Sequence, residues 1–126
     1  MGAGIVLDQE AIETIAEVCH EANRVLQRRN DEPVSPEWFE APEEQRDSVV
    51  SGVFHLISDP EATPEESHQE WLRFKERGGW AYGEVKSFRH RTHPNLLPYD
   101  QLSSDQRLKD ALFHGIVRAL AYGMRP

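Results

Sequence analysis

The 126-residue sequence contains a single cysteine, Cys19, and has no long run of apolar residues. One thiol cannot form an internal disulfide, which is typical of proteins in a reducing cytoplasm. The only early apolar stretch, residues 2–7, lacks a basic flank and is far shorter than a signal-peptide core or a membrane span. We therefore expect a cytoplasmic protein without a membrane partner.

The usual signatures of catalysis and metal binding are also missing. The sequence has no Gly-x-Ser-x-Gly, no His-Glu-x-x-His, no phosphate-binding glycine-rich loop and no zinc-type cysteine pair. Cys19 falls on the apolar face of a predicted helix, where a thiol is usually inert packing. We expect a protein that is not an enzyme and uses neither a metal nor a cofactor.

Positive charge is scarce over most of the chain but concentrated in one segment. Residues 1–70 carry 4 Lys and Arg against 17 Asp and Glu, whereas residues 71–93 carry 6 basic and 2 acidic groups. The net charge of −8 argues against binding a nucleic-acid polymer, which requires a broad basic surface. A local cationic segment fits a small anionic ligand. It also fits an ordinary solvated helix face followed by a basic loop.

What the sequence does contain is helical periodicity, which predicts one mainly α-helical domain over residues 1–126. The first helix begins after Asp8, an N-cap residue, and ends at residues 28–30. The second begins at Pro42 and stops at residues 58–60. Its predicted buried side chains are Val49, Val50, Val53, Phe54 and Ile57.

Two further helices follow a similar logic. Thr63-Pro64-Glu65-Glu66 is a strong helix start, and Gly78 follows the last turn at Arg77. The fourth helix begins with Ser103 and Gln106 in a capping-box arrangement. Its predicted apolar stripe consists of Leu108, Ala111, Leu112, Gly115, Ile116 and Ala119.

The irregular segment 80–102 separates the last two helices. Residues 80–86 alternate like a short strand, which would place Trp80, Tyr82, Glu84 and Lys86 on one face. Residues 95–97 form a second extended piece that could pair with it. The predicted fold is therefore a four-helix arrangement with a short two-stranded β-hairpin.

This segment is the best candidate site for a flat anionic ligand such as a nucleotide. Trp80 and Tyr82 offer ring faces, and Lys86, Arg89 and Arg91 offer positive charge. The alternative is structural: the two aromatic rings only anchor the strand to the helices. The full set of candidate ligand-binding residues is Trp80, Tyr82, Lys86, Arg89, Arg91, His93, Trp71, His68, His20, Asn23 and Arg24.

Three of these groups have their own alternatives. His90 and His93 could flank a metal, but loop histidines are more often solvated. His68 and Trp71, at i and i+3, fit either core-edge packing or a stacking pocket. The polar run 20–24 fits a ligand contact or a plain helix surface.

Several blocks of the sequence resemble the ryanodine-receptor repeat (RyR) domain over roughly residues 8–122. The most specific part is Gly79-Trp80-Ala81-Tyr82-Gly83 with Val85-Lys86 and the later His93-Pro94. The other matching blocks are residues 18–24, 60–65, Ser67-His68, Trp71, Leu97-Pro98-Tyr99-Asp100, Gln106-Arg107, Lys109-Asp110 and Leu112-Phe113.

The resemblance implies an α-rich fold with a short hairpin and a cleft for adenine nucleotides. In the receptors, paired repeats form this cleft and the tryptophan matching Trp80 lines it. Because this chain has one repeat, a two-sided cleft requires a homodimer. The single-unit form looks like the stand-alone bacterial or phage type, which would place a phage-encoded member in the host cytoplasm. Such members are thought to sense or sequester nucleotide-derived signals.

Three functions follow as hypotheses. The first is a small-ligand-binding domain for a nucleotide or nucleotide-derived signal, with phosphate contacts from Lys86, Arg89, Arg91 and Arg24. The second is an interaction or dimerisation module without a ligand, mediated by the Trp80–Gly83 segment. The third, with the least support, is a cyclic-nucleotide hydrolase that uses His20, His68 or His93.

Overall fold

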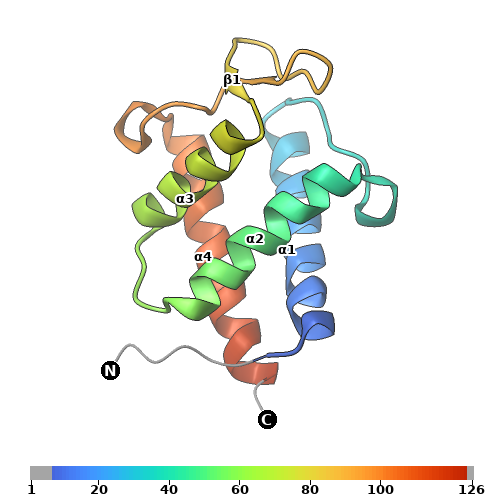
Figure 1. The fold of residues 1–126 in the computed structure, drawn as a ribbon, viewed down its shortest axis with the longest axis vertical. Helices are drawn as coiled ribbons and strands as arrows, with labels where there is room; N and C mark the ends of the chain where they lie inside the picture. Colours follow the sequence, from blue (N-terminus) through green and yellow to red (C-terminus); the bar gives the residue numbers. More distant parts are fainter. Residues whose placement is uncertain (1–6, 125–126) are drawn as a thin grey trace.

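The computed structural model describes residues 7–124 and consists of four α-helices with a minimal β element (Figure 1). The elements are α1 (Gln9–Arg29), the 3₁₀ turn η1 (Trp38–Glu40), α2 (Glu43–Ser58), α3 (Pro64–Arg77), β1 (Ala81–Tyr82), β2 (Thr92–His93), η2 (Tyr99–Gln101) and α4 (Ser104–Met124). None of the helices in this range is long and apolar enough to cross a membrane.

The predicted helix starts are confirmed by their caps. Asp8 accepts a hydrogen bond from the backbone N–H of Ala11 at 2.8 Å at the start of α1. Thr63 and Glu66 form a complete capping box at the start of α3, with Pro64 in its first turn. At α4 the N–H of Gln106 donates to the Ser103 hydroxyl at 3.2 Å. These local signals satisfy helix-end N–H groups that have no partner within the helix.

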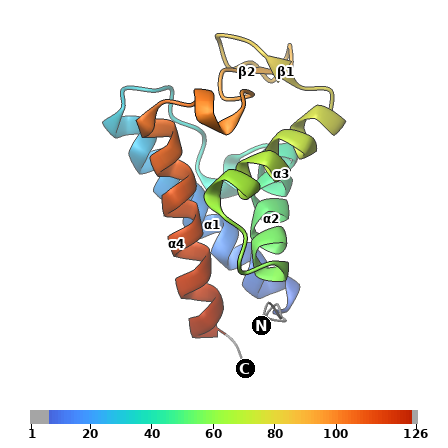
Figure 2. The same ribbon diagram turned by 90° about the vertical axis from the view of Figure 1, so that its left-hand side faces the viewer.

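The core lies where α1, α2 and α4 meet. Ile15, Val53 and Val117, one from each helix, are its largest fully buried side chains. Figure 2 shows α1 and α4 side by side, with the β segment above the C-terminal end of α3. The C-terminal end of α1, the C-terminal end of α3 and the N-terminal end of α4 all lie at this end of the bundle. These three helix ends hold the irregular segment, residues 80–102, in place.

The two-stranded element is present, but it is parallel and not a hairpin. Ala81 pairs with Thr92 and Tyr82 with His93, so the predicted pairing of residues 95–97 is wrong. The intervening chain makes its own reversal, because Ser87 and Thr92 form an antiparallel bridge through two backbone hydrogen bonds of 2.9 and 3.1 Å. After that reversal the chain runs alongside β1 in the same direction.

The predicted faces of two helices are also corrected. Phe54 on α2 is exposed, as are Leu108 and Leu112 of the predicted α4 stripe. The buried face of α4 instead contains His114, Val117 and Ala121. A polar residue fits there because His114 Nε2 and the Ser67 hydroxyl form a 2.7 Å hydrogen bond across to α3.

Candidate ligand site

Trp80 is buried and its ring is covered on several sides. Lys75 Nζ lies 4.6 Å from the ring centroid, and Phe88 packs edge-on at 5.3 Å. The indole N–H donates to Glu44 on α2 at 2.9 Å, and Arg91 forms an ion pair with the same carboxylate. These bonds from Trp80 first, then from Arg91, hold the pKa of Glu44 below its usual value. In this arrangement Trp80 offers no open face for stacking.

The alternation predicted for residues 80–86 therefore does not extend beyond β1. Trp80 is 4% exposed, whereas Tyr82, two residues on, is 51% exposed. The bulge after β1 is packed tightly, since a Cβ on Gly83 would lie 2.6 Å from the Thr92 Cβ. Glycine is required at this position because the returning chain crosses so close to it.

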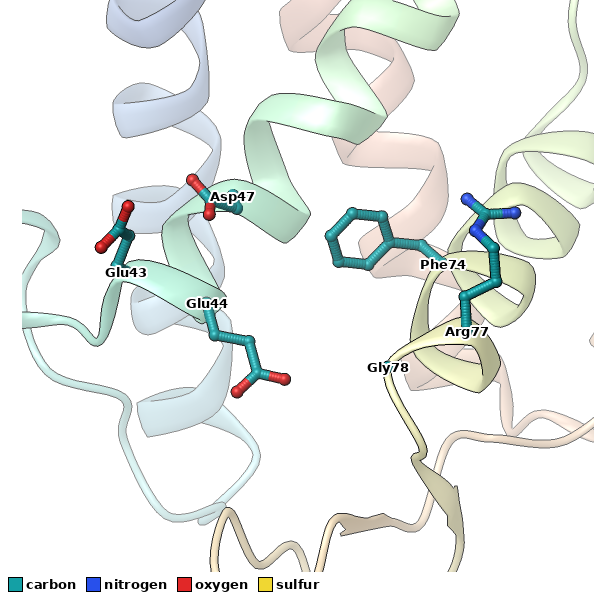
Figure 3. Close-up of a pocket in the computed structure, with 6 residues that line it drawn as sticks. All are labelled: Glu43, Glu44, Asp47, Phe74, Arg77 and Gly78. Atoms are coloured by element: carbon teal, nitrogen blue, oxygen red, sulfur yellow. The ribbon is translucent and has the colours of Figure 1, made fainter.

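A cavity of about 430 Å³ lies between the N-terminal end of α2 and the C-terminal end of α3 (Figure 3). Its lining residues are Glu43, Glu44, Asp47, Phe74, Arg77 and Gly78. Three carboxylates against one guanidinium make this a poor environment for an anion. The anionic ligand expected from the sequence does not suit this cavity.

A second cluster, built around Trp71, has the opposite electrostatic character. Trp71 is half-buried on α3 and stacks on His68 at 5.6 Å, one turn earlier on the same helix. His93 of β2 meets the indole edge-on at 5.1 Å. Tyr99 of η2 lies 6.0 Å from the His68 ring. The structure thus brings three of the candidate residues, His68, Trp71 and His93, into one cluster.

Three lysines from three segments act electrostatically on His93 of this cluster. Burial, followed by the charges of Lys86, Lys75 and Lys109, lowers the pKa of His93 to about 3. His93 is therefore neutral at physiological pH. Its Nδ1 accepts a 3.0 Å hydrogen bond from the backbone N–H of Asn95, which leaves the ring proton on Nε2.

Two of the three lysines have no ion-pair partner in the part of the chain that the structure describes. Lys109 forms a 2.6 Å ion pair with Glu32, but neither Lys75 nor Lys86 has a carboxylate within such a distance. Burial lowers the pKa of Lys75 to about 8. Burial and then Lys109 lower the pKa of Lys86. Glu44 partly offsets the charge of Lys75, and Glu32 that of Lys86, but neither carboxylate lies within ion-pair distance of these amines.

A hydrogen-bond chain fixes the loop that carries this cluster. Asn95 Nδ2 donates to Gln106 Oε1 at 2.6 Å, and Gln106 Nε2 donates to Glu32 at 3.2 Å. The chain links the segment after β2 to the N-terminal end of α4 and to the connector after α1. The positions of His93 and Lys109 are therefore set by side chains from three segments.

The other sequence-predicted residues lie elsewhere or point outward. His20 Nε2 and the Pro36 carbonyl oxygen are 2.7 Å apart, and Arg24 Nε donates to the Ser35 carbonyl at 2.9 Å. These two side chains hold the connector against α1, while Asn23 is half-buried on the same helix. Arg89 is exposed.

Sequence reasoning missed Lys75, Lys109 and Asp110 as members of the Trp71 cluster. For Lys75 a signal existed, because it follows Trp71 by four residues and therefore shares its helical face. For Lys109 and Asp110 no local signal existed, since only the packing of α4 against α3 brings them near His68.

The structure is thus a small helical domain with a short parallel strand pair and a candidate site, the Trp71 cluster, at one end. A family model for the RyR domain matches residues 55–122. The chain belongs to the RyR domain family. The matched range contains α3, both strands and most of α4, and hence the whole Trp71 cluster together with its three lysines.

Proposed function

We propose that the protein is a small-ligand-binding domain for a nucleotide or nucleotide-derived anion, held at the Trp71 cluster. The observation that carries this proposal is the pair of lysines, Lys75 and Lys86, that lack an ion-pair partner within residues 7–124. Both act electrostatically on His93, which contacts the half-buried Trp71. An anion bound there would add negative charge near both amines, which Glu44 and Glu32 compensate only from beyond ion-pair distance.

The arrangement supports a ligand with an aromatic part and a charged part. Trp71 and Tyr99 supply ring surface, and Lys86 and Lys109 supply positive charge on the loop and on α4. Base stacking on an aromatic side chain contributes about 1–3 kcal/mol, and a partly desolvated ammonium adds an ionic term. The domain holds this ligand without converting it chemically.

The direct test is a binding screen by thermal shift and calorimetry with ATP, ADP-ribose and a cyclic dinucleotide. We expect at least one of them to raise the melting temperature by mass action and Lys86→Ala to weaken its binding about tenfold or more. Arg77→Ala is the matched control, because it removes one positive charge from the acid-lined cavity instead. Equal losses in both variants, or no stabilisation by any of the compounds, would contradict the proposal.

Turnover is checked on the same samples. Chromatography of each ligand after prolonged incubation should return it unchanged. If a new product forms, and no longer forms in His68→Gln or His93→Gln, the protein is a hydrolase and the proposed binding function is wrong.

A second function is favoured by a separate observation. Tyr82, Val85 and Phe88 are all exposed on the segment around β1, with 51%, 74% and 37% of their surfaces accessible. Apolar side chains gathered on one short segment are typical of an interaction surface, and a homodimer through it would match the two-sided cleft of paired repeats. Sedimentation of the protein and of Val85→Lys decides this, since a dimer built on this surface should dissociate in the variant.

A further inference from the structure

Asp110 on α4 has a buried carboxylate oxygen in an unusual position. Its Oδ2 has no hydrogen-bond partner within residues 7–124, yet it lies 3.8 Å from Nδ1 of His68. An unsatisfied buried carboxylate oxygen costs free energy unless a proton or a donor reaches it.

The hydrogen bonding of His68 determines which of its nitrogens can supply that proton. His68 Nε2 is 2.7 Å from the carbonyl oxygen of Leu97, which can only accept, so Nε2 must carry the ring hydrogen. In a neutral His68 ring, Nδ1 is therefore an acceptor. Asp110 Oδ2 and His68 Nδ1 are then two acceptors 3.8 Å apart, beyond hydrogen-bond distance. A proton on either atom would make it a donor, and a small approach of the two side chains would then join them.

The surroundings favour holding that proton near neutral pH. Burial raises the pKa of Asp110 to about 7, and only the neighbouring Lys109 opposes this rise. Burial lowers the pKa of His68, although its bond to Leu97 acts in the other direction. Tyr99 of η2 and Trp71 of α3 cover the His68 ring, and His93 of β2 interacts with it electrostatically.

We propose that Asp110 and His68 hold one shared proton that regulates the anion site, so that the domain binds its ligand with uptake of a proton. This regulation rests on the function proposed above. With the proton in place the pair is neutral, and without it Asp110 carries a negative charge next to Lys109. Since a negative charge in the cluster repels an anion, ligand affinity rises as the pair becomes protonated.

The proton itself is tested without any ligand by NMR titration of the intact protein. We expect the Asp110 carboxyl carbon and the His68 ring nitrogens to report one common transition close to neutral pH, with Nε2 protonated throughout. An Asp110 carboxyl that is fully ionised at pH 6 beside a neutral His68 ring would overturn the shared proton.

The linkage is tested with sulfate as the anion, because its charge stays fixed across neutral pH. Between about pH 6 and 7.5 sulfate affinity should fall as pH rises, by less than tenfold per pH unit. The fall should exceed the small loss that Lys75, with a pKa of about 8, begins to contribute at the top of this range. Asp110→Asn should keep the low-pH affinity throughout, since its amide can donate to His68 Nδ1 and carries no charge. Asp105→Asn removes the same charge from an exposed position in the first turn of α4 and should leave the slope unchanged.

The two proposals fail in different ways. Equal pH slopes in the protein and in Asp110→Asn would overturn the linkage, even with sulfate bound. No sulfate binding at any pH, together with a normal shared-proton titration, would overturn the anion site and with it the linkage, and would leave the proton pair standing.

Discussion

Lys75 lies with its ammonium 4.6 Å from the centre of the Trp80 ring, buried and without an ion-pair partner among residues 7–124. Its charge is tolerated through this cation–π contact and the more distant Glu44 carboxylate. Burying the Lys75 ammonium costs folding free energy, whereas its positive charge favours a bound anion. Removing this charge should therefore raise stability and lower anion affinity.

Lys75→Met should therefore stabilise the protein while weakening its anion binding. Methionine fills a similar volume without the desolvation cost, and a pKa lowered to about 8 corresponds to a gain of about 1–3 kcal/mol at neutral pH. Urea unfolding at pH 7 measures the gain. Lys109→Met is the control: it breaks the ion pair with Glu32 and should lower stability. Destabilisation in both variants would show that Lys75 is adequately compensated in the folded protein.

Trp80 is expected to act as a core residue of the β segment. Trp80→Ala should cost about 3–5 kcal/mol of unfolding free energy, because it removes a buried ring. Trp80→Phe keeps much of the packing and should lose about 1–2 kcal/mol with the hydrogen bond to Glu44. Tyr82→Ala, at an exposed position, should change stability by no more than about 0.5 kcal/mol. Similar costs for both alanine variants would argue against the buried position of Trp80.

His93 should make the protein sensitive to mild acid. Its folded-state pKa of about 3 lies below its ordinary value of 6.5, so the unfolded chain binds the proton more tightly between these two values. The stabilisation from His93 is complete above pH 6.5 and is lost as the pH falls toward 3, by at most about 1.4 kcal/mol per pH unit. His93→Gln should flatten this part of the stability profile, whereas His90→Gln, at an exposed site, should not. If neither variant changed the dependence of stability on pH, the His93 ring would not be buried and neutral.

The corrected face of α4 gives a fourth prediction. Val117→Ala removes a side chain that is 1% exposed and should cost about 2 kcal/mol. Leu112→Ala removes a larger side chain that is 37% exposed and should cost about 0.5 kcal/mol. Chemical denaturation of the two variants compares the costs directly. If Leu112→Ala were the more damaging change, the stripe predicted from the sequence would be the buried one.

The ends of the helices could be predicted because their signals are local. Asp8, the Thr63–Glu66 box and Ser103 act through backbone groups three residues away, and each one caps the expected helix. The face of α4 could not be predicted in this way. Leu108 and Leu112 fit a helical period as well as the buried residues do. Which face of α4 is buried depends on the hydrogen bond between His114 and Ser67 of α3.

The candidate site likewise contains some features with a local sequence signal and others that depend on tertiary contacts. The spacing of His68 and Trp71 indicated that they share a face, and the structure places them in contact. The strand-like alternation of residues 80–86 was misleading, since Gly83 and the reversal at Ser87 end the strand after two residues. Glu32 and Lys109 are 77 residues apart, and only the tertiary fold joins them.

The Glu44 carboxylate, bound by both Trp80 and Arg91, has a practical consequence for the boundaries of the domain. Glu44 and Glu32 both precede the range 55–122 that the family model matches. A fragment cut to that range would leave the Trp80 indole N–H and the Lys109 ammonium without their acidic partners, and would lack α1, which supplies Ile15 to the core. We therefore expect that a fragment must include α1 to fold and to form the candidate site, although the family match begins only at residue 55.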